Sequence, residues 1–210
     1  MNYIDKYGER LLNAILTHLE IVLISVAAGF VVAFILGILL SRLPKISAIV
    51  IPILAVFQTI PGLVFIGVLF LYTGMQQITV IIALAIYAVF PILKNTYVGL
   101  ITVDSSLKEA ARGCGMNKLQ ILLNVELPLA SAAIVSGLRM STIYTVSWAV
   151  LAAMIGQGGL GEFVYQGIET NNNELIVIGA IPAAFLAMGL GYIIDKTQAR
   201  LTPRGLKKER

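Results

Sequence analysis

Charge is scarce in this 210-residue sequence: Asp, Glu, Lys and Arg make up 12% of it, whereas 58% is hydrophobic. Soluble domains usually carry about 25% charged residues, so the composition excludes an ordinary soluble protein. No charged residue stands between Lys45 and Lys94, and a run of that length holds two membrane crossings of about 20 residues each. The composition therefore predicts an integral membrane protein.

Residues for catalysis and metal binding are equally scarce. The single cysteine, Cys114, excludes an internal disulfide and any site with several cysteine ligands. The single histidine, His18, stands at the edge of the first apolar run without acid or thiol partners, which supports neither a triad nor a metal site. The P-loop pattern G-x-x-x-x-G-K-[ST] is absent. We expect a chain that is not an enzyme and that binds no cofactor or metal itself.

The apolar runs predict five membrane-spanning helices in a single transmembrane domain covering residues 1–210. They are residues 19–40, 49–73, 78–102, 130–155 and 175–194. The runs are apolar on every face, whereas the strands of a β-barrel would alternate, so an all-α integral membrane protein is the expected fold class.

The basic residues orient these spans. Most of them fall between the first two spans (Arg42, Lys45), in the loop 104–128 (Lys108, Arg112, Lys118) and in the tail 195–210 (Lys196, Arg200, Arg204, Lys207, Lys208, Arg210). Before the first span, Lys6 and Arg10 are balanced by Asp5 and Glu9. The loop 156–174 carries Glu162, Glu169 and Glu174 but no Lys or Arg. The positive-inside rule then predicts an outside amino terminus, with the loop 104–128 and the tail in the cytoplasm. This membrane-flanking distribution also argues against nucleic acid as a partner, despite the net charge of +4.

The polar segment 109–128 interrupts these apolar runs and predicts two short helices joined at glycine. Ser106 and Glu109 have the spacing of a capping box, and Gly113 and Gly115 supply the backbone freedom for a break. Apolar residues recur at helical spacing over 116–127, and Pro128 is predicted to stop or restart the helix. A solvated amphipathic loop is the alternative interpretation.

The spacing of this segment resembles the EAA loop of ABC importer permeases, the membrane subunits through which an ATPase drives uptake. Glu109, Ala110 and Ala111 are followed after three residues by Gly115, and after nine more by Val125, with Leu127 and Pro128 beyond. The resemblance implies a five-span type I ABC importer permease with a cytoplasmic coupling-helix loop. It also implies that this loop docks in a groove of the ATPase subunit through Glu109, Ala110, Ala111, Arg112, Gly115, Leu127 and Pro128.

Two spans contain polar breaks. The second has Gln58, Thr59 and Pro61 between two apolar halves, and the fourth carries Ser and Thr with Tyr144 and Trp148. Irregular backbone at membrane depth is tolerated where it faces protein or a water-filled cavity. The first break resembles the second core helix of the permease family, which lines the translocation path, and the resemblance implies that Gln58, Thr59 and Pro61 are candidate path residues. Tyr144 and Trp148, on a polar helix that is expected to face inward, are further candidates. The alternatives are an ordinary proline kink, and Ser and Thr that hold membrane helices together.

Residues 156–161 match the dinucleotide pattern G-x-G-x-x-G, but they follow an apolar helix rather than a β-strand. We interpret Gly156, Gly158, Gly159 and Gly161 as a flexible turn at the outer end of the fourth helix, followed by a short interfacial helix over 162–166. The permease resemblance implies that this turn shapes an outer gate or the surface that meets a substrate-binding protein.

Two basic residues fall within apolar runs. Lys94 lies roughly 12 Å from the inner end of the third span, and its long side chain is expected to reach the interface. Arg139 is expected to lie near the cytoplasmic entry of the fourth helix, with a pathway or gate charge as the alternative.

The five-span size and the segments QTIPGLVFIGVLF and TVSWAVLAAMIGQGGLGEFVYQGI resemble permeases for glycine betaine, carnitine and choline. The resemblance implies two identical or homologous permeases in a bacterial cell membrane. It further implies two cytosolic ATPase subunits that bind ATP and Mg, and a separate extracytoplasmic substrate-binding protein. Permeases for amino acids or methionine are the nearest alternative, and a scaffold or channel without transport coupling is a further one.

Overall fold

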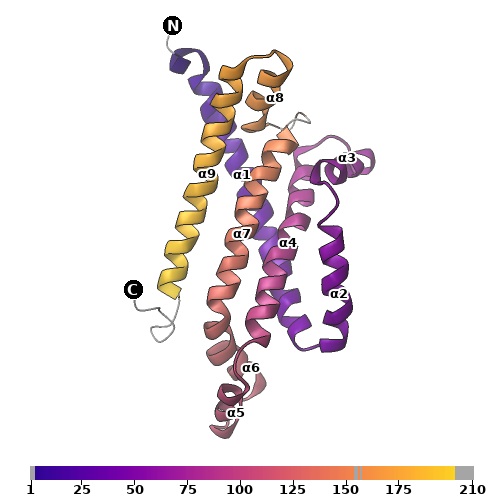
Figure 1. Ribbon diagram of the computed structural model, residues 1–210, viewed down its shortest axis with the longest axis vertical. Coiled ribbons are helices and arrows are strands. Elements are labelled where there is room, and N and C mark those ends of the chain that lie inside the picture. Colours follow the sequence, from indigo (N-terminus) through magenta and orange to yellow (C-terminus); the bar gives the residue numbers. More distant parts are fainter. Residues whose placement is uncertain (1–2, 154–155, 157, 202–210) are drawn as a thin grey trace.

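The computed structural model describes residues 3–153, 156 and 158–201, and all regular structure among them is helical. Four long helices form an elongated bundle: α1 (Tyr3–Ser41), α4 (Gln77–Ile101), α7 (Leu127–Ala153) and α9 (Asn173–Leu201) (Figure 1). The predicted all-α class is confirmed.

Four continuous helical stretches are long and apolar enough to cross a membrane: Tyr7–Ser41, Gln77–Ile101, Lys118–Ala153 and Asn173–Ala199. A fifth crossing is available if α2 (Pro44–Phe57) and α3 (Gly62–Thr73) together form one broken span. These two helices meet at 92°, so that α3 lies across the end of the bundle beside upright α2 (Figure 1). The bend is much larger than that of an ordinary proline kink.

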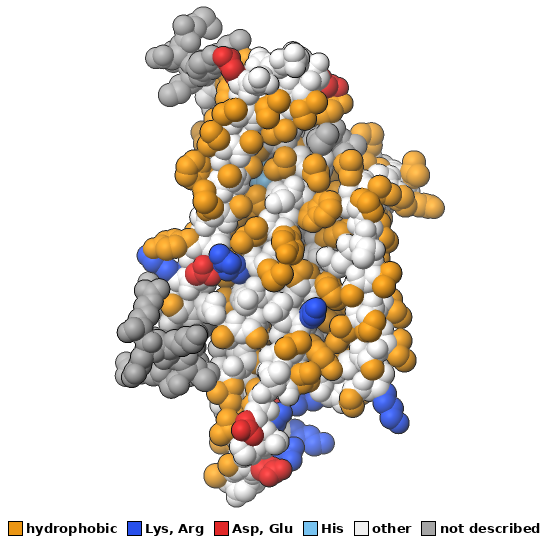
Figure 2. Space-filling model, in the orientation of Figure 1, with side chains coloured by type: hydrophobic (Ala, Val, Ile, Leu, Met, Phe, Trp, Pro, Cys, Tyr) orange, Lys and Arg blue, Asp and Glu red, His pale blue; other side chains and the backbone are white. Residues whose placement is uncertain are grey.

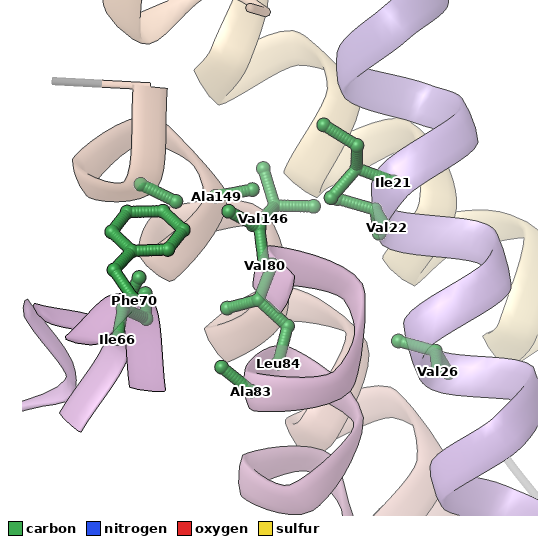
Figure 3. Close-up of a cluster of buried hydrophobic side chains, with 11 residues drawn as sticks. Ile21, Val22, Val26, Ile66, Phe70, Val80, Ala83, Leu84, Val146 and Ala149 are labelled. Carbon is green, nitrogen blue, oxygen red and sulfur yellow. The ribbon is translucent and has the colours of Figure 1, made fainter. Parts of the chain in front are cut away.

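The main core lies where α1, α3, α4 and α7 meet. Ile21 and Val22 of α1 face Val80 of α4 and Val146 of α7, and Phe70 of α3 closes the cluster (Figure 3). Glycine brings α1 and α4 together: a Cβ at Gly29 would stand 2.8 Å from Ala88. Small residues permit this close approach between membrane helices, where packing rather than water drives association.

The body of the bundle is covered with apolar side chains, while most charged ones gather toward its ends (Figure 2). Large hydrophobic residues of α1, α2 and α9 are widely exposed, among them Leu36, Ile53 and Phe185. An apolar surface of this extent is expected when lipid or other membrane helices surround the protein.

The connecting helices lie at opposite ends. α5 (Ser105–Gly113), α6 (Lys118–Ile121) and the π-helical turn η1 (Leu122–Glu126) project from one end, whereas α8 (Gly161–Glu169) and the start of α1 lie at the other (Figure 1). The loop predicted as cytoplasmic and the loop predicted as extracytoplasmic are thus separated by the length of the bundle.

Candidate functional site

The first short helix of the polar loop begins at a different cap from the predicted one. Asp104 is the N-cap of α5, and its carboxylate accepts a hydrogen bond from the Ser106 backbone amide at 2.8 Å. This hydrogen bond holds the pKa of Asp104 below its ordinary value. The predicted box between Ser106 and Glu109 was wrong, because a carboxylate at the helix N-terminus accepts from the backbone more strongly than a hydroxyl does.

The turn after α5 contains the glycine that the spacing singled out. Gly115 has a φ of 82°. Its amide donates to the Arg112 carbonyl, and the next amide, of Met116, donates to Ala111. These bonds form a Schellman C-cap, in which glycine avoids the strain of a left-handed residue. The following helix, α6, is capped by Asn117 in a capping box with Gln120. The helix–glycine–helix arrangement is as predicted.

The residues assigned to ATPase docking are distributed over two environments. Glu109, Ala110, Arg112 and Gly115 are exposed at the end of the bundle, whereas Ala111 is buried. Leu127 and Pro128 are partly buried at the start of α7. The loop therefore presents its first half outward and anchors its second half in the bundle.

Pro128 neither stops nor restarts the helix, contrary to the sequence-based expectation. α6, η1 and α7 follow one another without a break, and the whole stretch Lys118–Ala153 is one helix. In the π-helical turn just before the proline, the Leu127 amide donates to the Leu122 carbonyl five residues earlier. This wider turn accommodates the proline ring, which would otherwise clash with the preceding turn.

The most buried charge of this region, which the sequence pattern did not indicate, is that of Glu126, whose side chain is 2% exposed. Arg42, between α1 and α2, donates to both of its carboxylate oxygens, with Nη1 to Oε1 at 3.0 Å. Lys108 of α5 places its Nζ 3.9 Å from Oε1. Glu126 thus connects α5, the end of α1 and the start of α7.

The hydrogen bond to Glu126 raises the pKa of Arg42 above its ordinary value, so the guanidinium stays charged. Arg42 is 84 residues away from Glu126 along the chain, a distance that no local pattern encodes. The one available signal was a carboxylate placed directly before an apolar helix.

The break between α2 and α3 is held by α4. The Gln58 side chain donates to the Tyr87 carbonyl at 2.9 Å, and the Tyr87 hydroxyl donates to the Ile60 carbonyl at 2.7 Å. Pro61 is the N-cap of α3, and Thr59 bonds only within its own turn, to Val56. The irregular backbone is therefore satisfied by protein, as membrane depth requires.

Trp148 packs against this break. Its ring lies 5.6 Å from that of Tyr87, and a Cβ added to Gly62 would stand 2.5 Å from it. Gln58 and Tyr144 do line one cavity, of about 370 Å³, with Lys94 and Asn95. The structure thus brings two of the five candidate path residues together.

One buried hydroxyl of the fourth predicted span connects two helices. Ser141 donates to the Ala88 carbonyl of α4 at 3.0 Å, while Thr142 and Thr145 donate to carbonyls of α7 itself. All three are buried. Ser141 therefore fits the packing alternative, whereas Tyr144 is 46% exposed.

The glycines of the predicted outer gate form a turn packed on α1 and α7. Gly156, Gly158 and Gly159 have positive φ, and a Cβ on Gly159 would meet the ring of His18 at 3.2 Å. Gly161 begins α8, where a Cβ would come within 1.9 Å of the Val150 carbonyl.

His18 is buried within α1 instead of standing at a span edge, and its Nε2 lies 3.2 Å from the Val146 carbonyl. His18 lies inside the helix because α1 is longer than the predicted first span and begins at Tyr3.

Arg139 has a partner that the sequence did not suggest. Its Nε lies 2.9 Å from Asp195 of α9, and both side chains are about half exposed. Among the described residues, no group of three His, Cys, Asp or Glu is placed to hold a metal ion.

Comparison with known proteins gives full-length matches. The profile of the family described as "binding-protein-dependent transport system inner membrane component" covers residues 25–206. The carnitine transport permease protein OpuCB of Listeria monocytogenes is 40% identical, over 100% of this chain and 96% of that protein. The choline transport system permease protein OpuBB of Bacillus subtilis is 37% identical, over 99% and 96%.

The fold is similar to that of solved ABC transporters. A chain of the MetNI methionine ABC transporter in an inward-facing conformation has a TM-score of 0.84 and 22% identity, with 97% of this chain and 100% of that chain covered. At this identity the likeness shows the fold alone. The chain therefore belongs to the family of binding-protein-dependent transport system inner membrane components, as a multi-pass inner-membrane transport subunit that works with ATPase and substrate-binding partners and is not an enzyme.

Proposed function

We propose that this chain is the permease subunit of an ATP-driven importer for quaternary-ammonium osmoprotectants, namely glycine betaine, carnitine and choline. One observation carries the choice of solute: the full-length relatives at 37–40% identity are named as permeases for carnitine, for choline, and for glycine betaine, carnitine and choline together. The amino-acid alternative has only a similarity of fold in its favour.

The loop around α5 is the proposed ATPase-docking element. Glu109, Ala110 and Arg112 are exposed around a narrow face, and Leu107 and Leu119 add exposed apolar surface at the same end of the bundle. An apolar and charged projection of this kind suits a groove in a soluble subunit. ATP and Mg bind to that subunit, and this chain supplies no nucleotide site.

Motion of the docked loop has two routes into the bundle. One is covalent, through α6 and η1 into α7, which form one continuous helix. The other is the contact of Lys108 and Arg42 with Glu126, which reaches the end of α1. We infer that ATP-driven movement of α5 tilts α1 and α7 together and exchanges inward-open for outward-open states. Differential contacts in the two states would supply the work.

The remaining parts of the proposed assembly follow the family resemblance. The amino terminus lies outside, and α5 and the carboxyl-terminal end of α9 lie in the cytoplasm. Two permeases, identical or homologous, pair with two ATPase subunits. The turn formed by Gly156, Gly158, Gly159 and Gly161 faces the substrate-binding protein.

The test is uptake of labelled solutes by cells that lack their own osmoprotectant importers and express this chain with the ATPase and binding protein of its gene neighbourhood. We expect uptake of at least one of the three solutes, and its loss when the P-loop lysine of the ATPase is replaced. Uptake of methionine or other amino acids instead would refute the proposed solute class. Solute movement that persists without the ATPase would favour a channel.

A further inference from the structure

A mainly apolar cavity with a few polar side chains lies on the side of the bundle where the α2–α3 break, α4 and α7 meet. Its volume is about 370 Å³, which is within the range of about 300–1,000 Å³ for small-molecule pockets. Its lining residues are Gln58, Phe90, Pro91, Lys94, Asn95, Val98, Met140 and Tyr144. The cavity thus combines one cation, two amides and two aromatic rings.

Lys94 has no acidic partner in this cavity. Among the described residues, no carboxylate lies within ion-pair distance of the exposed Lys94. The same is true of Lys45, Arg112 and Lys118, but Lys94 lies inside the apolar helix α4. Its Nζ lies 5.9 Å from the centroid of the Phe90 ring. Lys94 precedes the end of α4 by seven residues, or about 11 Å at the helical rise. A charge at such a position in an apolar helix commonly marks a substrate or ion pathway.

The side chains around Lys94 are held in place by the bundle. Asn95 donates to the Pro91 carbonyl at 2.8 Å, and Gln58 donates to the Tyr87 carbonyl at 2.9 Å. Each amide nitrogen keeps a second N–H, so both remain able to donate to a ligand. Tyr144 and Phe90 offer ring faces, which attract quaternary ammonium groups.

We propose that this cavity is a transient solute site in which Lys94 binds the carboxylate of a zwitterionic quaternary ammonium compound, with the ammonium group against Tyr144 and Phe90. The inference rests on the proposed osmoprotectant function. Glycine betaine and carnitine carry both groups, whereas choline has no carboxylate. Lys94 therefore favours the two zwitterions and repels the cation choline.

The experiment measures uptake of labelled glycine betaine, carnitine and choline by proteoliposomes that contain the permease, its ATPase and its binding protein. The variants are Lys94→Met, which removes the charge, Lys94→Arg, which keeps it, and Tyr144→Leu, which removes a ring. Lys45→Met is the matched control, because Lys45 is an exposed cation at the start of α2, away from the cavity. Rates are normalised to the amount of assembled complex.

Lys94→Met is expected to lower the ratio of glycine betaine to choline uptake about tenfold or more, since a lost charged hydrogen bond has an effect of that size. Lys94→Arg should keep the ratio within about threefold, and Tyr144→Leu should lower uptake of the transported solutes alike. Lys45→Met should leave the ratio unchanged. If Lys94→Met leaves the ratio of glycine betaine to choline uptake unchanged, either with normal rates or with an equal loss of all solutes, the proposal is overturned.

Uptake by the wild-type complex distinguishes a failure of the proposed function from a failure of the proposed site. If it imports none of the three solutes, the proposed function and this site both fail. If it imports choline alone, the osmoprotectant function stands and the carboxylate site is wrong. If it imports a zwitterion and Lys94→Met does not discriminate, only the site is wrong.

Discussion

Glu126→Gln is the substitution whose consequence the structure defines best. The carboxylate is 2% exposed and meets Arg42, whose side chain is 46% exposed, and Lys108 at 3.9 Å. Exposed ion pairs contribute roughly 0–1 kcal/mol, whereas breaking a fully buried pair costs about 3–5 kcal/mol. With one partner buried and the other half exposed, we expect a coupling free energy of about 2 kcal/mol between Glu126 and Arg42.

A double-mutant cycle measures this value. Glu126→Gln, Arg42→Gln and the double variant are unfolded with SDS in mixed micelles, and helicity is followed by circular dichroism. The same cycle with Lys45→Gln in place of Arg42→Gln is the control, because Lys45 is an exposed cation and the ion-pair partners of Glu126 among the described residues are Arg42 and Lys108. Its coupling should be within about 0.5 kcal/mol of zero, as for independent sites. A coupling that small for Arg42 as well would refute the reasoning.

Three further predictions concern the loop and the opposite end of the bundle. Glu109→Lys and Gly115→Val should leave the protein inserted but reduce ATPase co-purification and uptake at least tenfold. The first reverses a charge, and the second introduces strain of roughly 1–3 kcal/mol at a φ of 82°. Retention of normal coupled transport by both variants would contradict the docking role. Asp104→Ala should speed hydrogen exchange at the Ser106 amide. Because the pKa of Asp104 is lowered in the folded protein, its cap stabilises α5 at pH values above the pKa of the unfolded chain and weakens as pH falls through the pKa of the folded protein. The protection of the Ser106 amide from exchange in the wild type should therefore decline only in acid. A variant whose exchange matches that of the wild type at neutral pH would disprove the cap. Gly161→Ala should lower the free energy of unfolding by about 1–3 kcal/mol, because its Cβ would stand 1.9 Å from the Val150 carbonyl. Gly113→Ala is the control, because Gly113 has open space around it. Equal free energies of unfolding for the two variants would count against the close packing of α8.

Local chemistry in the sequence was sufficient for the fold class and for the shape of the loop. Long apolar runs have few folded alternatives in a membrane, so the helical bundle followed from composition. The glycine at position 115 has the left-handed φ that a helix–turn–helix requires. The cap was misassigned because Asp104, Ser105 and Ser106 all carry acceptors, and only the backbone geometry shows which one is used.

Features that depend on distant residues could not be predicted. Glu126 is buried only because Arg42 and Lys108 arrive from other elements. The 92° bend near Pro61 depends on the Tyr87 hydroxyl, which donates to the Ile60 carbonyl of the broken backbone, and on Gln58, whose side chain donates to the Tyr87 carbonyl of α4. Sequence alone could not separate Ser141, which bonds α4, from Tyr144, which faces the cavity, because both are polar residues on one helix. The roles of the docking, path and gate residues stay predictions.

ATP-driven uptake by the reconstituted complex tests the central claim most directly. Proteoliposomes containing this permease, its ATPase and its binding protein are loaded with ATP and Mg and supplied with labelled glycine betaine, carnitine or choline, beside matched vesicles carrying the Glu109→Lys permease. We predict accumulation of at least one solute against its gradient by the wild type, with little or none in the variant. Accumulation that is equal in both, or that needs no ATP, would contradict the account.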